Sequence, residues 1–229
     1  MTPNWNVTPT EARAEQNRLR NEVRIEPLDV DSVALVAGCD LSFDRGSDHV
    51  FAGIVTLRMP SLEVEERAGV ETIARFPYIP GLLSFRESPP LLQAWSRLLT
   101  KPDALIVDGH GYAHPRRFGI ACHLGLLLDL PTAGCAKSIL VGSHEPVGEQ
   151  PGEWKPLVDK GEVIGAAVRT RFGVMPVYVS IGNRIDLESA IALVLRCSGR
   201  TRVPETTRRA HRFVNELRLS SHDSDPADS

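Results

Sequence analysis

The order of strand-like and helix-like segments constrains the fold of this chain more than any other feature of its sequence. Three strand-like segments follow one another through short connections, which favours an antiparallel meander, and helix-like and strand-like segments alternate after them. Strands are expected at residues 33–39, 49–59, 63–74, 104–107, 132–136, 163–171 and 176–181, the last two as a hairpin. This order predicts an α/β fold, with a mixed sheet and helices on both of its faces.

Helix starts are visible at two places in the sequence. Thr8 can cap a helix, Pro9 suits the first helical position, and Glu11 can reach back to the cap. Asp186 can cap another helix, whose apolar residues recur every three or four positions and share one face. Helices are expected from Thr8 to about Val23, from Pro89 to Leu99, from Pro115 to Leu128, after Asp186, and across Ala210–Leu217.

No internal repeat and no long linker divides the chain, which predicts a single domain over residues 1–219. Residues 220–229 are polar and acidic, and we expect them to form a disordered tail. The stretch 142–161 is polar and rich in glycine, and no strand is expected there.

Composition bounds the class of protein. Hydrophobic residues make up 42% and charged residues 24% of the 229 residues, as in ordinary soluble proteins, and there is no run of about eighteen apolar residues that would indicate a membrane span. The N-terminus lacks the basic start and apolar stretch of a secretion signal. The four cysteines lie in apolar segments without a C-x-x-C pair, which favours reduced, buried thiols over zinc ligands or disulfides. We therefore expect a cytoplasmic monomer that does not contact membranes.

Two aspartates stand where buried strands are expected to end. Asp40 follows the run VALVAGC, and Asp108 follows ALIV. A carboxylate there is unfavourable unless it is paired or binds a cation, and oxygen ligands favour Mg2+ or Mn2+ over Zn2+. Glu87, at the end of FPYIPGLLSFRE, is a candidate third ligand. The alternatives are that both aspartates cap turns and that Glu87 forms an exposed salt bridge with Arg86 or Arg117.

Basic side chains near these acids are candidates for contacts with anions. Lys137 follows a buried strand, where its ammonium group needs a carboxylate of the site or a substrate phosphate as partner. His114, Arg116 and Arg117 form a basic cluster beside Asp108. This cluster indicates either phosphate binding or a solvated helix N-terminus.

The remaining histidines and a group of arginines leave alternatives open. A zinc pair of His110 and His114 is disfavoured because glycine and proline interrupt the helix that would align them. His123 lies in an apolar helix and is expected to be a core residue, whereas His211, between arginines, is as well suited to a site as to a surface. Seven arginines between positions 196 and 218 form either a phosphate-binding patch or a solvated helix face.

Four segments of the sequence resemble the endonuclease V family. They are AGCDLSF at 37–43, PYIPGLLSFRE at 77–87, VDGHGYAHPRRFGIACHLGLLLDLPTAGCAKS at 107–138 and TTRRAHRFVNEL at 206–217. The resemblance implies a ribonuclease H-like fold and makes residues 1–219 one catalytic domain. It also implies a Mg2+-dependent DNA repair enzyme, with Mn2+ as a substitute. Such an enzyme nicks single- or double-stranded DNA at the second phosphodiester bond 3′ to deoxyinosine and leaves a 3′-hydroxyl and a 5′-phosphate.

The same resemblance implies roles for particular residues. Asp40 and Asp108 are similar to the family's direct metal ligands, and Glu87 to its third acid. Lys137 resembles a lysine near the scissile phosphate, and His211 a histidine close to the metal. Contacts with the substrate are implied for Tyr78, as a wedge in the base stack, and for Pro80, Gly81, Leu83, Gly109, Gly111, His114 and Arg116.

This chain departs from the family pattern at a few positions. Asn183 stands where many members have histidine, so a role of that position in tuning the site is uncertain, while Cys122 and Cys135 are expected to be packing changes. Two alternative functions remain: an endoribonuclease specific for inosine in RNA, and a non-catalytic protein that binds inosine. All acids and the lysine of the motifs are present, which favours the enzyme.

Overall fold

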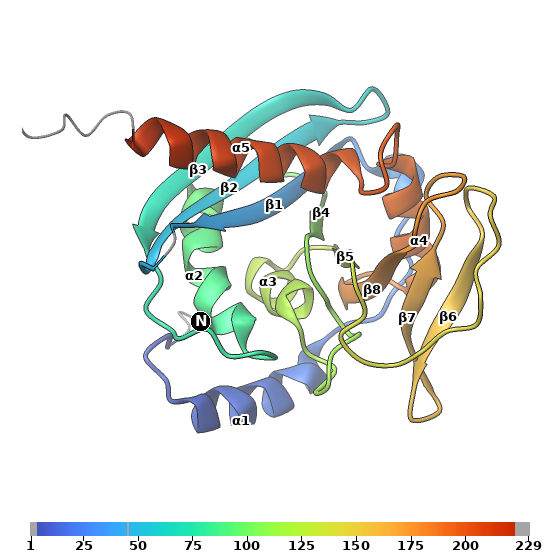
Figure 1. The fold of residues 1–229 in the computed structure, drawn as a ribbon, viewed down its shortest axis with the longest axis horizontal. Coiled ribbons are helices and arrows are strands. Elements are labelled where there is room, and N and C mark those ends of the chain that lie inside the picture. The colour runs from blue at the N-terminus through green and yellow to red at the C-terminus, as the bar shows by residue number, and fades with distance from the viewer. Residues whose placement is uncertain (1–3, 45, 223–229) are drawn as a thin grey trace, which may run out of the picture.

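The computed structural model describes residues 4–44 and 46–222, and within them it shows an eight-stranded mixed sheet in the order β3-β2-β1-β4-β5-β8-β7-β6 (Figure 1). The strands are β1 Leu35–Phe43, β2 His49–Arg58, β3 Glu63–Ile73, β4 Ala104–Val107, β5 Thr132–Ala136, β6 Trp154–Asp159, β7 Glu162–Val168 and β8 Val177–Asn183. Neighbours β1–β4 and β4–β5 are parallel, and the other pairs are antiparallel. The expected meander of β1, β2 and β3 and the hairpin of β7 and β8 are confirmed.

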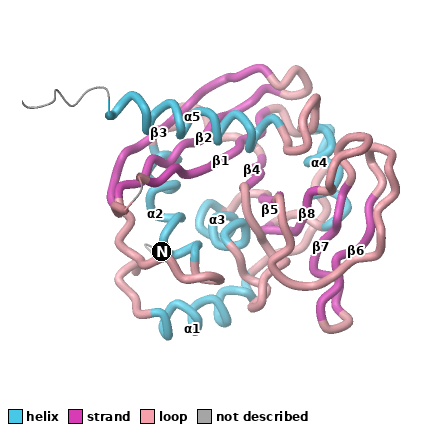
Figure 2. The backbone as a smooth tube through the Cα atoms, in the orientation of Figure 1, coloured by secondary structure: helices cyan, strands magenta, loops and turns pink. Residues whose placement is uncertain are grey.

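Helices cover both faces of this sheet, as the sequence predicted (Figure 2). They are α1 Pro9–Leu19, α2 Leu83–Ser96, α3 Ile120–Leu128, α4 Leu187–Arg196 and α5 Glu205–His222, with short 3-10 turns at Arg20–Glu22 and Val30–Ser32. Apolar residues of α2 and α3 pack on one face of the sheet, and those of α4 and α5 pack on the other. None of the described helices is long and apolar enough to cross a membrane.

The two predicted helix caps are present. The side chain of Thr8 accepts a hydrogen bond from the backbone N–H of Glu11, and the Glu11 carboxylate accepts one from the N–H of Thr8. Asp186 accepts a hydrogen bond from the N–H of Ser189 at the start of α4. Local sequence therefore determines where these two helices begin.

The end of β4 defines the edge where the acids meet. Val107, the last residue of β4, pairs with Cys39 of β1 in parallel register. Strand β1 continues past this point as far as Phe43, paired with β2 alone. The expectation that the first strand ends at Asp40 is therefore wrong: Asp40 lies within β1, at the point where β1 loses its neighbour on one side. Asp108 follows β4 at the same level.

Helix α5 lies unusually close to β1 because of one glycine. A Cβ atom built on Gly38 would lie 2.3 Å from the backbone carbonyl of Thr206, nearer than real Cβ atoms approach. Gly38, Asp40 and Ser42 are spaced two residues apart along β1, so these three positions lie on the same face of the strand. The absence of a side chain at Gly38 therefore allows α5 to approach the face from which Asp40 projects.

Two helix starts in the first half of the chain differ from the sequence-based expectation. Helix α2 begins at Leu83 and contains Pro89 and Pro90, although proline had indicated a helix start there. Burial of Phe85 and Arg86 outweighs the hydrogen bonds that the prolines remove. Helix α3 begins at Ile120 instead of Pro115, and the intervening loop includes a left-handed residue, Arg117, with φ of 56°.

Two further differences lie in the second half of the chain. Strand β6 falls inside the stretch 142–161, where no strand was expected; it is an edge strand that contains a proline, so its pattern is weak. Helix α5 begins at Glu205 and extends to His222, beyond the expected domain end at 219. The remainder of the predicted tail, 223–229, lies outside the described residues.

All four cysteines are buried free thiols, as expected. Burial raises the pKa of Cys122 to about 12, so this thiol is neutral at physiological pH. Cys122 and Cys135 belong to the interior of the protein, in agreement with their interpretation as packing changes.

Candidate functional site

Asp40 and Asp108 meet at the open edge between β1 and β4. They follow the paired residues Cys39 and Val107, and their side chains are mostly buried, with relative exposures of 15% and 16%. Burial raises the pKa of Asp40, and the negative charge of Asp108 raises it further. The fold thus holds two like charges together in a poorly solvated place.

Each aspartate has a basic side chain on one carboxylate oxygen. The Lys137 ammonium group, just after β5, lies 2.5 Å from Oδ2 of Asp108. The Nδ1 atom of His211, on α5, lies 2.7 Å from Oδ2 of Asp40. The other oxygen of Asp40 accepts a hydrogen bond from the N–H of Leu41. Of the two partners expected for Lys137, a carboxylate of the site or a substrate phosphate, the structure shows the carboxylate, and His211 lies beside the other aspartate.

Glu87 approaches the same acids from the opposite face of the sheet. It lies in the second turn of α2, and burial raises its pKa to about 7, followed in importance by the charge of Asp40. The alternative of a salt bridge with Arg86 or Arg117 does not hold. Arg86 binds Asp48, while Arg117 binds acids of the β6–β7 hairpin.

These three acids fit a divalent cation by their chemistry. Each offers oxygen ligands, and the raised pKa values of Asp40 and Glu87 reflect repulsion and burial that a cation would relieve. Across residues 4–44 and 46–222, however, no group of at least three histidine, cysteine, aspartate or glutamate side chains is arranged closely enough to hold an ion as it stands. A cation between Asp40 and Asp108 would therefore compete with Lys137 for an oxygen of Asp108.

A cavity of about 300 Å³ opens beside Glu87 and Asp108, at the lower end of the size range of small-molecule sites. Its lining includes several of the residues that sequence analysis proposed as substrate contacts: Tyr78, Pro80, Gly81, Leu83, Gly109 and His114. It also includes residues that sequence analysis missed: Gln16, Ser84, His110, Gly119, Ile120, Ser138, Ile139 and Leu140. The exposed Tyr78 side chain, at 70% relative exposure, stands at its rim.

One wall of the cavity is fixed by the carbonyl oxygen of Gly81. This oxygen accepts hydrogen bonds from Gln16 Nε2 at 3.1 Å, His114 Nε2 at 3.0 Å and Arg116 at 2.5 Å. Because a carbonyl only accepts, Nε2 of His114 carries a proton, while Nδ1 accepts from the N–H of Arg116. Burial lowers the pKa of His114 to about 4, so the ring is neutral.

The basic cluster beside Asp108 therefore stabilises the fold around the cavity. His114 and Arg116 hold the Gly81 loop, and Arg117 binds Asp159 and Glu162 at 2.8 and 2.7 Å. Neither a free set of phosphate ligands nor a solvated helix N-terminus describes these contacts. Gln16 is the long-range partner that local sequence could not reveal.

Gly111 allows the loop after β4 to pack against β8, and it is not among the residues that line the cavity. A Cβ atom there would lie 1.9 Å from the carbonyl oxygen of Ile181 on β8, so the loop after β4 can pack only without a side chain at this position. Its N–H donates to the Ser180 hydroxyl at 2.9 Å. His110 does line the cavity, and burial lowers its pKa.

A second set of contacts supports His211 at Nε2, the ring nitrogen that does not face Asp40. The side-chain amide of Asn215 lies 3.2 Å from Nε2 of His211, and its carbonyl oxygen accepts a hydrogen bond from the Ser42 hydroxyl at 3.0 Å. Sequence analysis missed Asn215 and Ser42. The only signal was spacing, because residues four apart on α5 share a face, as do residues two apart on β1.

Two other residues are placed away from the acids. Asn183 is buried at the far end of the sheet, paired with the first residue of β5, Thr132, and its side chain binds Gly125 and the N–H of Arg24. It therefore acts in packing and does not touch the site. His123 is a buried core histidine whose Nδ1 lies 3.1 Å from the Ser84 hydroxyl, as expected.

Comparisons with known proteins point to one family. The family model described as Endonuclease V matches residues 17–212. Endonuclease V of Myxococcus xanthus is 51% identical over 93% of this chain and 91% of its own length. The Streptomyces avermitilis Endonuclease V structure has a TM-score of 0.92 and 41% identity, covering 97% of this chain and 98% of that one. A Ciona intestinalis Endonuclease V bound to DNA containing an inosine followed by a ribo-adenosine has a TM-score of 0.83 and 26% identity, covering 93% and 98%.

Proposed function

This chain belongs to the endonuclease V family of nucleases, and we propose that it nicks DNA at the second phosphodiester bond 3′ to deoxyinosine, leaving a 3′-hydroxyl and a 5′-phosphate. We further propose Mg2+ as the cofactor, with Mn2+ as a substitute. The observation that carries the proposal is the meeting of Asp40 and Asp108, each beside a basic group, next to a cavity.

The three acids would hold the metal. Asp40 and Asp108 are its proposed direct ligands, with Glu87 as the third acid. When bound, a divalent ion neutralises phosphate charge and lowers the pKa of a coordinated water molecule. The support from the protein is the donor set, which consists of carboxylate oxygens in a buried place, where burial and the charge of Asp108 raise the pKa of Asp40, and burial and the charge of Asp40 raise that of Glu87.

Of the two basic side chains beside the acids, Lys137 would act on the scissile phosphate and His211 would remain paired with Asp40. The Lys137 ammonium group is proposed to turn from Asp108 to a phosphate oxygen and to stabilise negative charge as it develops. His211 is proposed to stay beside Asp40, since Asn215 supports its ring from the other side. Both roles use groups that the fold already brings to the acids.

The cavity would receive the base. Extruding a base from a duplex requires a few kcal/mol, and less when its pairing is weak, as for hypoxanthine. Tyr78 is proposed to enter the gap in the base stack, because its ring is exposed at the rim of the cavity. The loop of Pro80, Gly81 and Leu83, together with Gly109, would then contact the extruded base.

A second substrate is favoured by a specific observation. The DNA bound to the Ciona intestinalis protein carries a ribonucleotide directly after the inosine. A backbone with a 2′-hydroxyl at that position is therefore compatible with a related site. Inosine in RNA is the alternative substrate for this chain.

The test is a cleavage assay on matched DNA and RNA oligonucleotides that carry one inosine, with and without Mg2+. We expect a single cut in the presence of Mg2+, so that the 5′ fragment ends with the 3′ neighbour of inosine and the 3′ fragment begins with the nucleotide after it. Cutting of RNA alone would replace the DNA proposal by the RNA alternative. Binding without cutting of either strand, in Mg2+ or Mn2+ and with enzyme in excess, would identify a non-catalytic inosine-binding protein.

A further inference from the structure

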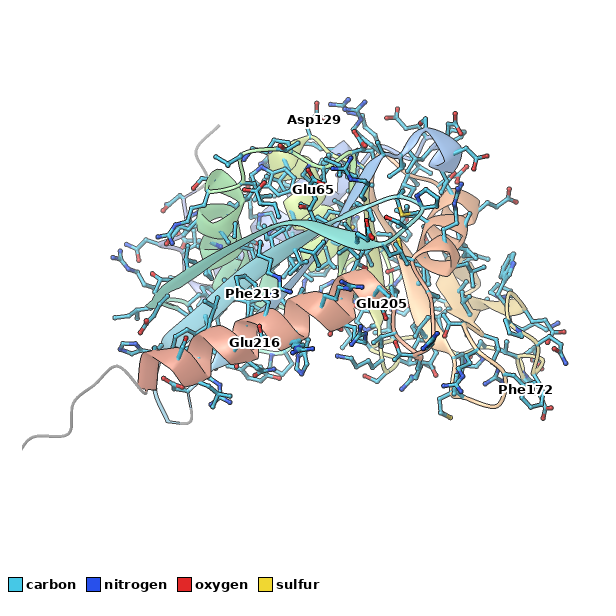
Figure 3. The ribbon with its side chains drawn as sticks, turned by 90° about the horizontal axis from the view of Figure 1, so that it is seen from above. Glu65, Asp129, Phe172, Glu205, Phe213 and Glu216 are labelled. Carbon is cyan, nitrogen blue, oxygen red and sulfur yellow. The ribbon has the colours of Figure 1, made fainter. Side chains whose placement is uncertain are left out.

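A second cleft, away from the acids, lies between α5 and β3. It has a volume of about 240 Å³, and four arginines dominate its lining: Arg67, Arg208, Arg209 and Arg212, together with Phe213 and Glu216. Figure 3 shows Glu205, Phe213 and Glu216 along α5, from the start of the helix toward its end. We refer to this group of six lining residues as the arginine cleft.

The arginine cleft carries an excess of positive charge. Its four guanidinium groups face only two carboxylates in the ion pairs of the described residues: Glu205 binds Arg208 and Arg209, and Glu216 binds Arg212 at 2.6 Å and Arg67 at 3.6 Å. The side chains of Arg212 and Arg67 remain 75% and 48% exposed. Two arginines would be enough to balance the charge of these two acids. The cleft has four, so it presents net positive charge to solvent.

The cleft faces a different direction from the catalytic groups of the same helix. His211 and Asn215 contact Asp40 and Ser42 of β1 on one flank of α5. The arginine cleft lies on the flank toward β3, since Arg67 belongs to that strand. A nucleic acid at the acids would therefore have to extend over the outer surface of α5 to reach the arginines.

Only part of the arginine-rich sequence contributes to this cleft. Arg196 pairs with Asp31, and Arg202 donates to the carbonyl oxygens of Lys137 and Pro176. These two arginines are used within the fold. Of the seven arginines in residues 196–218, the structure thus brings three, Arg208, Arg209 and Arg212, to the cleft. Arg67, which is distant in sequence, joins them there.

We propose that the arginine cleft binds backbone phosphates of the nucleic acid outside the inosine site, an inference that rests on the proposed function. Guanidinium groups suit phosphate oxygens because they present paired N–H donors. A nucleoside does not fit equally well, because Phe213 is the one ring in the cleft and the guanidinium of Arg67 already stands 5.8 Å from its centroid. The cleft therefore contributes affinity that is independent of base sequence.

Substitutions of the arginines and of Glu216 in the cleft should change the affinity for nucleic acid in opposite directions. Replacing Arg67 or Arg212 with glutamine removes a phosphate contact, whereas Glu216→Gln removes a carboxylate that competes with phosphate for both arginines. Arg18→Gln is a matched control, because Arg18 is also an exposed arginine paired with glutamates, on α1 at the other side of the molecule from α5 (Figure 1).

The measurement is the equilibrium affinity for a duplex without inosine as a function of NaCl concentration. We expect Arg67→Gln and Arg212→Gln each to weaken binding about 3- to 10-fold and to reduce the slope of log K against log salt by about 1. Glu216→Gln should tighten binding about 2- to 5-fold, and Arg18→Gln should match wild type. Equal affinities and slopes for wild type and the three cleft variants would overturn the proposal, as would an equal loss in Arg18→Gln.

Free phosphate compounds are the competing ligands for this cleft. Inorganic phosphate and ATP are titrated against wild type, and binding of either one that Arg212→Gln abolishes, with the duplex affinity unchanged, would assign the cleft to free phosphate compounds and overturn the proposal. Cleavage of an inosine strand by wild type is measured alongside. Wild type that binds the duplex through the cleft but cuts no inosine strand contradicts the proposed function and still supports the cleft.

Discussion

The Nδ1 atom of His211 lies 2.7 Å from Oδ2 of Asp40, although 171 positions separate the two residues in sequence. The contact depends on α5 lying directly against β1, because His211 projects from one flank of α5 while Asp40 projects from β1 toward that helix. Gly38 permits this approach, since its neighbour across the gap is the backbone of Thr206. The close approach of α5 to β1 thus makes the contact between His211 and Asp40 possible.

Substitution of Gly38 tests this dependence. Gly38→Ala places a methyl group 2.3 Å from the Thr206 carbonyl, so α5 must shift. We expect a loss of about 1–3 kcal/mol in the free energy of unfolding, as for other overpacked sites, and slower cutting by the protein that remains folded. Chemical denaturation and single-turnover cleavage measure the two effects. Gly199→Ala, where a Cβ meets only ordinary contacts, is the control, and equal behaviour of both variants would contradict the argument.

Tyr78 is expected to affect binding and not the fold. Its side chain is 70% exposed, so Tyr78→Ala should change the free energy of unfolding by less than about 0.5 kcal/mol. If the ring replaces lost base stacking, affinity for an inosine duplex should fall by about 1–3 kcal/mol, with Tyr78→Phe near wild type. Fluorescence anisotropy measures this affinity. Phe172→Ala removes another exposed ring, at 59% exposure, and a similar loss in that control would argue against a wedge.

His123 should make stability depend on pH. Burial lowers its pKa from 6.5 to about 4, so between these values the unfolded chain binds a proton that the folded protein does not. The free energy of unfolding should therefore fall as the pH drops from 6.5 to 4, by about 1.4 kcal/mol per pH unit from this residue. His123→Phe should lose this part of the slope in urea denaturation at several pH values. An identical slope would show that His123 is protonated in the folded state.

Asn183 should matter for stability alone. It is buried, and its side chain accepts a hydrogen bond from the N–H of Arg24 and donates one to the carbonyl oxygen of Gly125, so Asn183→Ala leaves both of these backbone groups without that partner. We expect a loss of about 2–4 kcal/mol in the free energy of unfolding, with an unchanged cutting rate per folded molecule. Asn21→Ala, whose side chain makes one long contact with Asn17, should be neutral. A reduced rate in folded Asn183→Ala would indicate that this position does influence the site.

Much of the fold could be predicted from local patterns. Strands β4 and β5 have the bounds that their apolar runs indicate, because each is buried along its whole length. The start of α2 could not be predicted in this way, since Pro89 and Pro90 give a strong local signal for a helix start and only tertiary burial overrides it. Strand β6 lacks a local signal because one side of an edge strand has no neighbouring strand.

The candidate site shows the same division. Asp40, Asp108 and Lys137 could be chosen from sequence because a charged group after an apolar run is physically unusual. For His211 the residues left site and surface equally open, and only the resemblance favoured the site. The partners of Gly81 could not be chosen, because Gln16 and Arg116 reach its carbonyl from distant parts of the chain. Asn215 was missed for the same reason, since its role depends on its contacts with His211 and with Ser42, which lies on a distant strand.

The central claim is that Asp40 and Asp108 together hold one catalytic divalent ion. The most direct test is the single-turnover cutting rate of an inosine oligonucleotide as a function of Mn2+ concentration, for wild type, Asp40→Asn, Asp108→Asn and the double variant. The account predicts that each single variant is slower by a factor of about a thousand and that the double variant is no slower than either. Cutting by Asp40→Asn or Asp108→Asn at the wild-type rate and Mn2+ dependence would contradict it.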